Sequence, residues 1–560
     1  MRRDLLALLA LLLIGCPGAD DDDAADDDDA ADDDDDAADD DDAADDDDAA
    51  DPVELANPLE WAATNGVVEG TMTVQFAENE IFINDPDTLA VSSVTVNTRT
   101  YDGTIPGPTI RLAVGDRMDF DLVNDLPVNE DDGEPITNHN FPHRINSTNF
   151  HTHGLHVDPT GDGDNVIREI EPQTTRGVAM DIPANHNPGS FWYHGHKHGA
   201  NVVQFLSGMT GMIVIEGDLD AVPEIAAAEE KMLVINELGL DAAGEVPPVN
   251  ENANGPGDVF AITQTLYPVS GVVNPVIRMA PGEVQRWRIV NATLGQFLNL
   301  SLADHDLNVL AWDGVALAAA AAEDDVRLSP GNRVDVLVQA GAAGTYRLSA
   351  PLGGAPGPGN DQVFATVVVE GDARAMSLPA TLPTPDALLP DASTDLPDDT
   401  RTSVMSVGEP GELNGFLIDG SPFQHGCSNH LLQRGDLVEW TVSNTSGIPH
   451  PFHIHTNAFQ VIEAPGQGLD LPVWRDVIEV PGNSSVTFRM RMDDFVGAIV
   501  LHCHIITHED LGMMQNVTIV DDTIDPSDVV TDPGIDADDP STANPAVPGY
   551  YVSSNFTVCE

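Results

Sequence analysis

Apolar and polar positions alternate along most of this 560-residue chain. Three stretches share one pattern, in which a turn containing Gly and an acidic residue is followed by alternating apolar residues and a final Asn. They read VGDRMDFDLVN (114–124), PGEVQRWRIVN (281–291) and RGDLVEWTVSN (434–444). Alternation with a period of two predicts a strand with one buried face. Spacings of 167 and 153 residues between the repeats suit β-sandwich domains, so we expect three antiparallel sandwiches in tandem.

A second repeat distinguishes the outer domains from the middle one. PGSFWYH, AGTYRLS and VGAIVLH each end five residues after a glycine, at His194, Ser349 and His502. The equivalent strand therefore carries histidine in the first and third domains and serine in the second. This difference predicts that the outer domains hold the functional site and that the middle domain is a spacer.

The start of the chain predicts export. MRRDLLALLALLLIGC contains two arginines, an apolar run from Leu5 to Ile14 and then Gly15-Cys16, which together form a short secretory signal. The apolar run is too short to span a bilayer as a mature helix. Because residues 13–16 resemble a lipobox, we expect Cys16 to be acylated and to anchor the protein in the cell envelope. An ordinary cleaved signal with an incidental cysteine is the alternative.

Residues 19–51 consist of aspartate runs separated by Ala-Ala pairs. Like charges at this density repel one another, which predicts an extended, disordered tether, with weak cation binding as an alternative role.

The rest of the chain is also strongly acidic, because the 22 aspartates of this tract account for less than a third of the net charge of −72. Such a surface excludes nucleic acid as a partner and favours cations. Lysine occurs only at Lys197 and Lys231, a bias that equally fits a protein kept soluble in high salt.

Ten of the 18 histidines fall into four compact clusters. On a strand, residues i and i+2 face the same side, so each His-x-His pair directs two imidazoles toward one point. Four such pairs can surround a group of metal ions. The clusters are His151 and His153; His194 and His196; His450, His453 and His455; and His502, His504 and His508.

Cys503 points to the opposite face from His502 and His504, so it can bind a different metal ion. The ligands available to it are His450 and His508, with Met513 five residues after His508. Two imidazoles, a thiolate and a weak axial thioether form a blue-copper electron-transfer site.

In order and spacing, the four clusters resemble the signature of the multicopper oxidases, a laccase-like family with three cupredoxin domains. The similarity runs from about residue 67 to residue 520. It implies an all-β fold of three tandem cupredoxin-like Greek-key sandwiches. The expected segments are a signal (1–16), a tether (17–55), domain one (56–220), domain two without copper (221–385), domain three (386–522) and a C-terminal tail (523–560).

The resemblance also implies about four copper ions and a ligand set for each. Type 1 copper would be bound by His450, Cys503 and His508, with Met513 axial. Type 2 copper would be bound by His151 and His453. The paired type 3 coppers would be bound by His153, His194, His196, His455, His502 and His504. All of these residues are present, which argues against the copper-free relatives of the family.

The implied reaction has two halves. A reducing substrate gives up electrons one at a time at the type 1 site, and these pass through Cys503 to His502 and His504, where dioxygen is reduced to water. Protons are also needed, and the family pattern places acids at Asp162 and Glu509. In so acidic a chain, both could instead be solvated surface residues.

The reducing substrate is less defined than the site. Phenols or similar organic reductants are the leading hypothesis, and oxidation of Cu(I), Fe(II) or Mn(II) is the alternative. The absence of a Met-rich insert among the 14 methionines disfavours a cuprous oxidase, whereas the acidic surface would attract metal cations. A copper-binding envelope protein with little catalysis is a third hypothesis, which the complete ligand set disfavours.

Two cysteines remain once Cys16 is assigned to lipid and Cys503 to copper. An exported protein permits a disulfide, so we expect Cys427 and Cys559 to be joined. This bond would tie the C-terminal tail to the third domain.

Overall fold

The computed structural model describes residues 50–521, except 134, 251, 254, 353–360, 384–388, 390 and 410–414, and it also describes Cys559. These residues belong to one unit, Ala49–Glu560. The expected signal with Cys16, most of the expected tether and most of the expected tail lie outside the described residues. None of the helices in the described part is long and apolar enough to cross a membrane.

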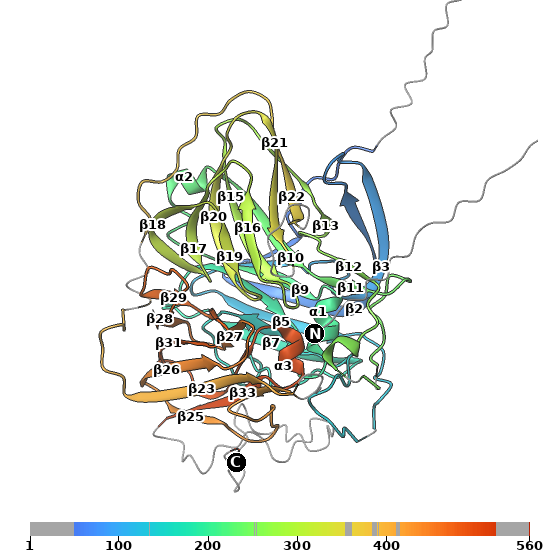
Figure 1. The fold of residues 1–560 in the computed structure, drawn as a ribbon, viewed down its shortest axis with the longest axis vertical. Helices are drawn as coiled ribbons and strands as arrows, with labels where there is room; N and C mark the ends of the chain where they lie inside the picture. Colours follow the sequence, from blue (N-terminus) through green and yellow to red (C-terminus); the bar gives the residue numbers. More distant parts are fainter. Residues whose placement is uncertain are drawn as a thin grey trace, which may run out of the picture. The chain divides into compact units, whose positions relative to one another are not determined.

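Strands dominate the described chain and form three pairs of sheets (Figure 1), which confirms the predicted all-β fold. The strands of the first pair are β1 (Glu60–Ala62), β2 (Val67–Asn84), β3 (Val91–Tyr101), β4 (Thr109–Ala113), β5 (Arg117–Asn124), β6 (His151–His153), β7 (Thr174–Asp181), β8 (Gly189–His194), β9 (Thr210–Glu216) and β13 (Val272–Val273). One sheet has the order β1-β4-β9-β8-β6, and the other has the order β13-β2-β5-β7 with β3 paired to β2.

The strands of the middle pair are β10 (Glu229–Asn236), β14 (Val276–Met279), β15 (Val284–Ala292), β16 (Leu298–Leu302), β17 (Leu307–Trp312), β18 (Val315–Glu323), β19 (Val326–Leu328), β20 (Arg333–Gln339), β21 (Gly344–Pro351) and β22 (Asp361–Val369). Their orders are β10-β15-β20-β17-β18 and β14-β22-β21-β16-β19. The short strand β13 also comes from the segment expected to form domain two, yet it pairs with β2. The residue boundaries of the three domains stay a prediction.

The strands of the third pair are β23 (Asp399–Val407), β24 (Phe416–Ile418), β25 (His430–Gln433), β26 (Leu437–Asn444), β27 (His450–Ile454), β28 (Phe459–Glu463), β29 (Val473–Arg475), β30 (Val477–Val480), β31 (Ser484–Arg491), β32 (Gly497–Cys503) and β33 (Met514–Val520). Their orders are β24-β23-β26-β31-β28-β29 and β25-β33-β32-β27-β30. The remaining elements are a two-stranded sheet of β11 (Leu238–Leu240) and β12 (Gln264–Leu266), the helices α1 (Asn201–Leu206), α2 (Pro223–Ala226) and α3 (Ile506–Asp510), and a 3-10 turn at Pro256–Asp258.

The repeated sequence motif performs the same structural task in all three sheet pairs. Its glycines, Gly115, Gly282 and Gly435, all have positive φ, which a residue with a side chain rarely adopts. Its final asparagine is buried each time, and the side-chain Nδ2 donates to two backbone carbonyl oxygens at 2.7 to 3.1 Å. These asparagines are Asn124, Asn291 and Asn444. The motif therefore encodes a turn, a strand and a buried asparagine whose hydrogen bonds hold the following segments of the chain in place.

The predicted single buried face is present in β5 and β26 but is wrong for β15, which is buried along its whole length. The second face of β15 carries Arg286 and Arg288, whose guanidinium groups donate to Asp335 at 2.7 and 2.9 Å and to Asp220 at 2.5 and 2.7 Å. Buried charges are tolerated when they are paired in this way. The alternating pattern therefore does not reveal that the polar residues of β15 are also buried, where ion pairs stabilise their charges.

The expected disulfide between Cys427 and Cys559 is present in the structure and joins residues 132 positions apart. The backbone N–H of Cys559 also donates to the Ser428 carbonyl at 3.2 Å.

Replacing Cys427 with serine is expected to lower the free energy of unfolding by at most about 4 to 5 kcal/mol, because closing so long a loop restricts the unfolded chain. Urea unfolding of the variant measures the loss. Wild-type protein treated with a reductant is the matched control and is expected to unfold at the same urea concentration as the variant. Equal stability of the variant and the untreated wild type would show that the disulfide contributes nothing.

Candidate metal centre

Each of the four His-x-His pairs begins on a strand, and these strands form two pairs of neighbours. In the first sandwich, β6 carries His151 and pairs with β8, so that His151 stands opposite His194. In the third sandwich, β27 carries His453 and pairs with β32, so that His453 stands opposite His502. The regular pairing of short strands therefore places histidines distant in sequence side by side.

The two halves meet in one buried cluster. The Nε2 atom of His196 lies 3.2 Å from both His455 Nε2 and His502 Nε2, and the last two atoms are 3.4 Å apart. The Nε2 atom of His504 lies 3.2 Å from Nδ1 of His153. Each of these contacts joins two ring nitrogens, and all but the one between His455 and His502 join the first sandwich to the third. This is the arrangement expected when the nitrogens share a metal ion.

The remaining members complete the cluster. Ligand atoms of His151, His453 and His455 lie within 4.8 Å of one another, as do those of His151, His153 and His194. Burial, followed by neighbouring imidazoles, lowers the pKa of His151 well below its usual value, which keeps the ring neutral and its lone pair available.

The hydrogen bonds of the cluster fit metal binding. The Nδ1 atoms of His194 and His453 each lie 2.7 Å from a backbone carbonyl oxygen, of Gly195 and Asp476 respectively. Their Nε2 atoms, like that of His151, are buried without any hydrogen-bond partner. One ring nitrogen anchored to a carbonyl and the other left bare is the usual state of a metal-ligating histidine. An all-imidazole donor set also suits copper, so these residues fit the implied copper ions.

A second group surrounds Cys503, which is fully buried at the end of β32. Its Sγ atom lies 3.5 Å from Nδ1 of His450 and 3.7 Å from Nδ1 of His508, and these two nitrogens are 3.3 Å apart. Met513 is buried in the same apolar core, and its backbone N–H donates to the His508 carbonyl at 2.8 Å. Burial raises the pKa of the Cys503 thiol, so a bound cation is needed to hold the thiolate.

One edge of this second group approaches the surface. His508 is half-buried, and its ring stacks on Phe416 with the centroids 4.0 Å apart. His450 is fully buried, and its Nε2 lies 2.9 Å from Ser446 Oγ. His508 is therefore the most solvent-accessible of the three residues His450, Cys503 and His508.

Glu509 lies at the histidine cluster. It is fully buried in α3, with Oε2 3.3 Å from His502 Nδ1 and Oε1 3.6 Å from His196 Nδ1. Asn201 of α1 donates to its Oε1 at 2.5 Å, and Figure 1 shows α1 beside α3. Burial first, and Asp510 second, raises the pKa of Glu509 well above its usual value.

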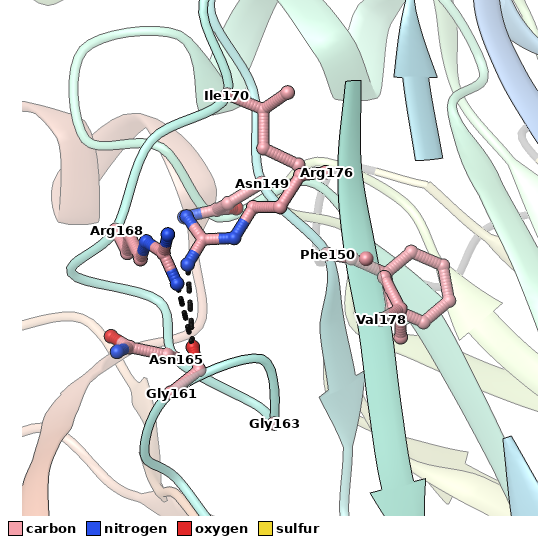
Figure 2. A pocket seen from close by; sticks show the side chains of 10 residues that line it. Asn149, Phe150, Gly161, Gly163, Asn165, Arg168, Ile170, Arg176 and Val178 are labelled. Carbon is pink, nitrogen blue, oxygen red and sulfur yellow. Dashed lines mark hydrogen bonds between the residues drawn. The ribbon is translucent and has the colours of Figure 1, made fainter. Parts of the chain in front are cut away.

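Asp162 lies outside the cluster. Its side chain is 54% exposed and forms ion pairs with Arg168 at 3.0 Å and Arg176 at 3.8 Å. Figure 2 shows both guanidinium groups converging on the neighbouring Gly161 carbonyl, to which they donate at 3.4 and 3.3 Å. The solvated alternative for this acid therefore matches the structure.

Asp164 is the acid that this loop directs toward the cluster, and sequence reasoning missed it. It is 3% exposed, and both carboxylate oxygens lie 3.0 Å from His151 Nδ1. A turn closed by the bond from the Asp164 N–H to the Asp158 carbonyl, 2.9 Å long, directs it inward. Burial raises the pKa of Asp164 to about 8. The second aspartate of GDGD was the available signal.

Comparison with known proteins agrees with this geometry. Three sequence models described as multicopper oxidase match residues 85–220, 186–372 and 393–523. A multicopper oxidase of Staphylococcus haemolyticus is 23% identical, over 81% of this chain and 89% of its own. Laccase-1 of Trametes villosa is 25% identical, over 76% of this chain and 86% of its own.

Among solved structures, a multicopper oxidase from Campylobacter jejuni, described as a metallo-oxidase, superimposes with a TM-score of 0.66 and 26% identity, covering 83% of this chain and 95% of its own. The family models together match well over half of the residues, and the buried histidines fit copper. The chain therefore belongs to the multicopper oxidase family, whose members are copper-dependent oxidoreductases that use dioxygen as the electron acceptor.

Proposed function

We propose that this oxidase is laccase-like and oxidises phenolic or similar organic reductants. The family carries about four copper ions. When bound, copper supplies one-electron chemistry at the cysteine site and four-electron reduction of dioxygen to water at the histidine cluster. We assign the type 1 ligands to His450, Cys503 and His508 with Met513 axial, the type 2 ligands to His151 and His453, and the type 3 ligands to His153, His194, His196, His455, His502 and His504.

The arrangement around Cys503 supports transfer of electrons between the two centres. The cysteine is covalently flanked by His502 and His504, whose side chains point to the other face of the strand. In addition, Nδ1 of His502 lies 3.1 Å from the Cys503 carbonyl oxygen, as expected for an N–H···O bond. The route from the thiolate to the cluster therefore runs through a few covalent bonds and one hydrogen bond.

Asp164 and Glu509 supply the proton chemistry in this proposal. Asp164 holds Nδ1 of His151, and Glu509 lies beside His196 and His502, so the two carboxyl groups contact the cluster at different histidines. Burial favours the protonated form of both, which suits groups that hand protons to reduced oxygen.

The side chains around His508 support the proposal of an organic substrate. The described ring contact of His508 outside the ligand set is Phe416, a buried aromatic residue, so the packing beside His508 is apolar and not charged. Five groups of three or more metal-binding side chains occur in the described part of the chain. Four consist of residues of the cysteine site or the histidine cluster, and the fifth joins two cluster histidines to Asp476. The described residues thus offer no separate cation site beside His508.

Oxidation of metal ions is the second candidate. The net charge of −72 attracts cations, and the similar Campylobacter jejuni protein is described as a metallo-oxidase. Oxygen uptake by copper-loaded protein distinguishes the two substrates when a methoxyphenol is compared with Cu(I), Fe(II) and Mn(II) at matched concentrations. We expect the phenol to give the highest kcat/KM, and faster turnover with a metal ion would replace the laccase assignment.

Export completes the proposal. The disulfide between Cys427 and Cys559 supports folding in an oxidising compartment. The signal-like first 16 residues support export, with a lipid on Cys16 holding the enzyme in the cell envelope. Labelling with a radioactive fatty acid tests the anchor, and a Cys16→Ser variant that still takes up label would contradict it.

Replacing Met513 with leucine is expected to raise the reduction potential of the type 1 copper without emptying the site. The thioether is a weak axial donor, and its loss favours the reduced ion while three strong ligands remain. A redox titration of the blue absorption measures the shift. Loss of the type 1 copper from this variant would show that the axial assignment is wrong.

A further inference from the structure

The middle sandwich contacts the histidine cluster through the turn between β19 and β20. Gly331 in this turn has a φ of +93°, and a Cβ atom there would lie 2.9 Å from Cδ2 of His504. A side chain at this position would therefore collide with a cluster histidine. The turn places the next strand, which begins at Arg333, directly behind the cluster.

Arg333 forms polar contacts from the middle sandwich to the third and the first, next to the bond that Asn332 Nδ2 donates to the Val477 carbonyl. Its guanidinium group donates to both carboxylate oxygens of Asp476, at 2.6 and 2.5 Å, and its Nε donates to the Ser190 carbonyl at 3.2 Å. Arg333 is fully buried and Asp476 is 2% exposed. A buried bidentate pair has a fixed geometry, because two parallel hydrogen bonds determine the plane of each partner.

Asp476 in turn contacts one histidine from each outer sandwich. Its backbone carbonyl oxygen lies 2.7 Å from Nδ1 of His453, and its carboxylate Oδ1 lies 3.5 Å from Nε2 of His153. These ring nitrogens point away from the centre of the cluster. The Asp476 carbonyl therefore fixes the rotation of the His453 imidazole, whereas its carboxylate lies close to His153 without a hydrogen bond to it.

Gly154 provides an independent indication of how closely this pair fits. It follows His153 directly, has a φ of +87°, and would place a Cβ atom 2.4 Å from both Arg333 Nη2 and Asp476 Oδ2. The final glycine of the HTHG motif is thus required because the ion pair occupies the space of a side chain. The segment after the first His-x-His motif therefore packs directly against Arg333 and Asp476, with no space for a side chain between them.

We propose that Arg333 is a positioning residue of the dioxygen-reducing centre. Arg333 is not a metal ligand, but its ion pair holds Asp476 in place, and the backbone carbonyl of Asp476 sets the orientation of His453. The inference rests on the ligand assignment proposed above. It gives a part in the chemistry to the middle sandwich, which was expected to be a spacer because its equivalent strand carries Ser349 in place of histidine.

The test is Arg333→Met in the full-length, copper-loaded protein. Partners that orient a metal-binding histidine are typically worth about 10- to 100-fold in affinity or activity, so we expect kcat to fall by that factor while KM for the phenol stays unchanged. The type 2 electron paramagnetic resonance signal is expected to weaken or to change its hyperfine splitting. The blue type 1 absorption should keep its intensity, because Arg333 does not contact Cys503, His450 or His508.

Arg286→Met is the matched control. Arg286 is equally ion-paired and buried in the neighbouring strand β15, but its partners are Asp220 and Asp335. We expect its melting temperature to fall while its type 2 signal stays like that of the wild type. An equal change of the type 2 signal in both variants would reduce Arg333 to a general packing role.

Arg333→Lys covers the case in which the methionine variant does not fold. Lysine keeps the charge but lacks the planar fork, so we expect a type 2 signal between those of the wild type and the methionine variant. A type 2 signal and kcat identical to those of the wild type in a folded Arg333 variant would overturn the proposal. A wild-type protein that binds copper but lacks any type 2 signal would overturn the ligand assignment and this inference together.

Discussion

Replacing Cys503 with serine is expected to abolish the blue absorption of the copper-loaded protein and to stop substrate oxidation. Sγ lies 3.5 and 3.7 Å from the two Nδ1 atoms of the type 1 histidines, and a hydroxyl does not replace a thiolate toward copper. Loss of the electron-accepting site should lower the oxidation rate by about a thousandfold or more, equivalent to a barrier increase of about 4 kcal/mol. The visible spectrum and oxygen uptake measure both effects.

The same substitution at a cysteine outside the site is the matched control. Cys427→Ser removes the disulfide and should leave the blue absorption intact. The serine at 503 is close in size to cysteine, so the variant should fold and keep most of the copper in the histidine cluster. Full activity in Cys503→Ser would overturn the assignment of both centres.

Asp164→Asn is expected to slow oxygen reduction about 10- to 100-fold. The amide oxygen can still accept a hydrogen bond from His151 Nδ1, from which both carboxylate oxygens of Asp164 lie 3.0 Å away, but the amide group is not an acid and cannot release a proton. Reduction of the blue copper by the phenol without oxygen should proceed at the wild-type rate, because Asp164 lies at the histidine cluster and not at Cys503. Stopped-flow absorbance with and without oxygen separates the two half-reactions.

Asp162→Asn is the control in the same loop. Its carboxylate is exposed and paired with Arg168 and Arg176, so turnover is expected to stay within about a factor of two of wild type, as surface ion pairs contribute little. Slow turnover in Asp162→Asn together with normal turnover in Asp164→Asn would return the proton-donating role to Asp162.

Local patterns in the sequence were sufficient to predict the fold class and the clustering of the metal-binding side chains. The alternation of residues 437–444 gives a strand with one buried face, since the side-chain period of a strand is two. The same period of two directs the Cys503 side chain to the opposite face from the side chains of His502 and His504. Those relations hold between residues close together in the sequence, so neither required knowledge of the tertiary structure.

Features that depend on contacts between distant segments were missed. Asp162 and Asp164 are both aspartates and lie two positions apart, so the sequence pattern does not distinguish them. Only the turn closed by the hydrogen bond from Asp164 to Asp158 determines which one faces His151. Arg333 and Asp476 lie 143 positions apart and were each an ordinary charged residue in an acidic chain. The buried face of β15 was hidden for the same reason, because its arginines are paired across strands.

The most direct test of the central claim is anomalous X-ray diffraction at the copper absorption edge from crystals of the copper-loaded protein. The assignment predicts one peak among His450, Cys503 and His508 and a group of three peaks enclosed by the four His-x-His pairs, for the four ions typical of the family. A map with no peak beside Cys503, or with only one peak among the paired histidines, would contradict it.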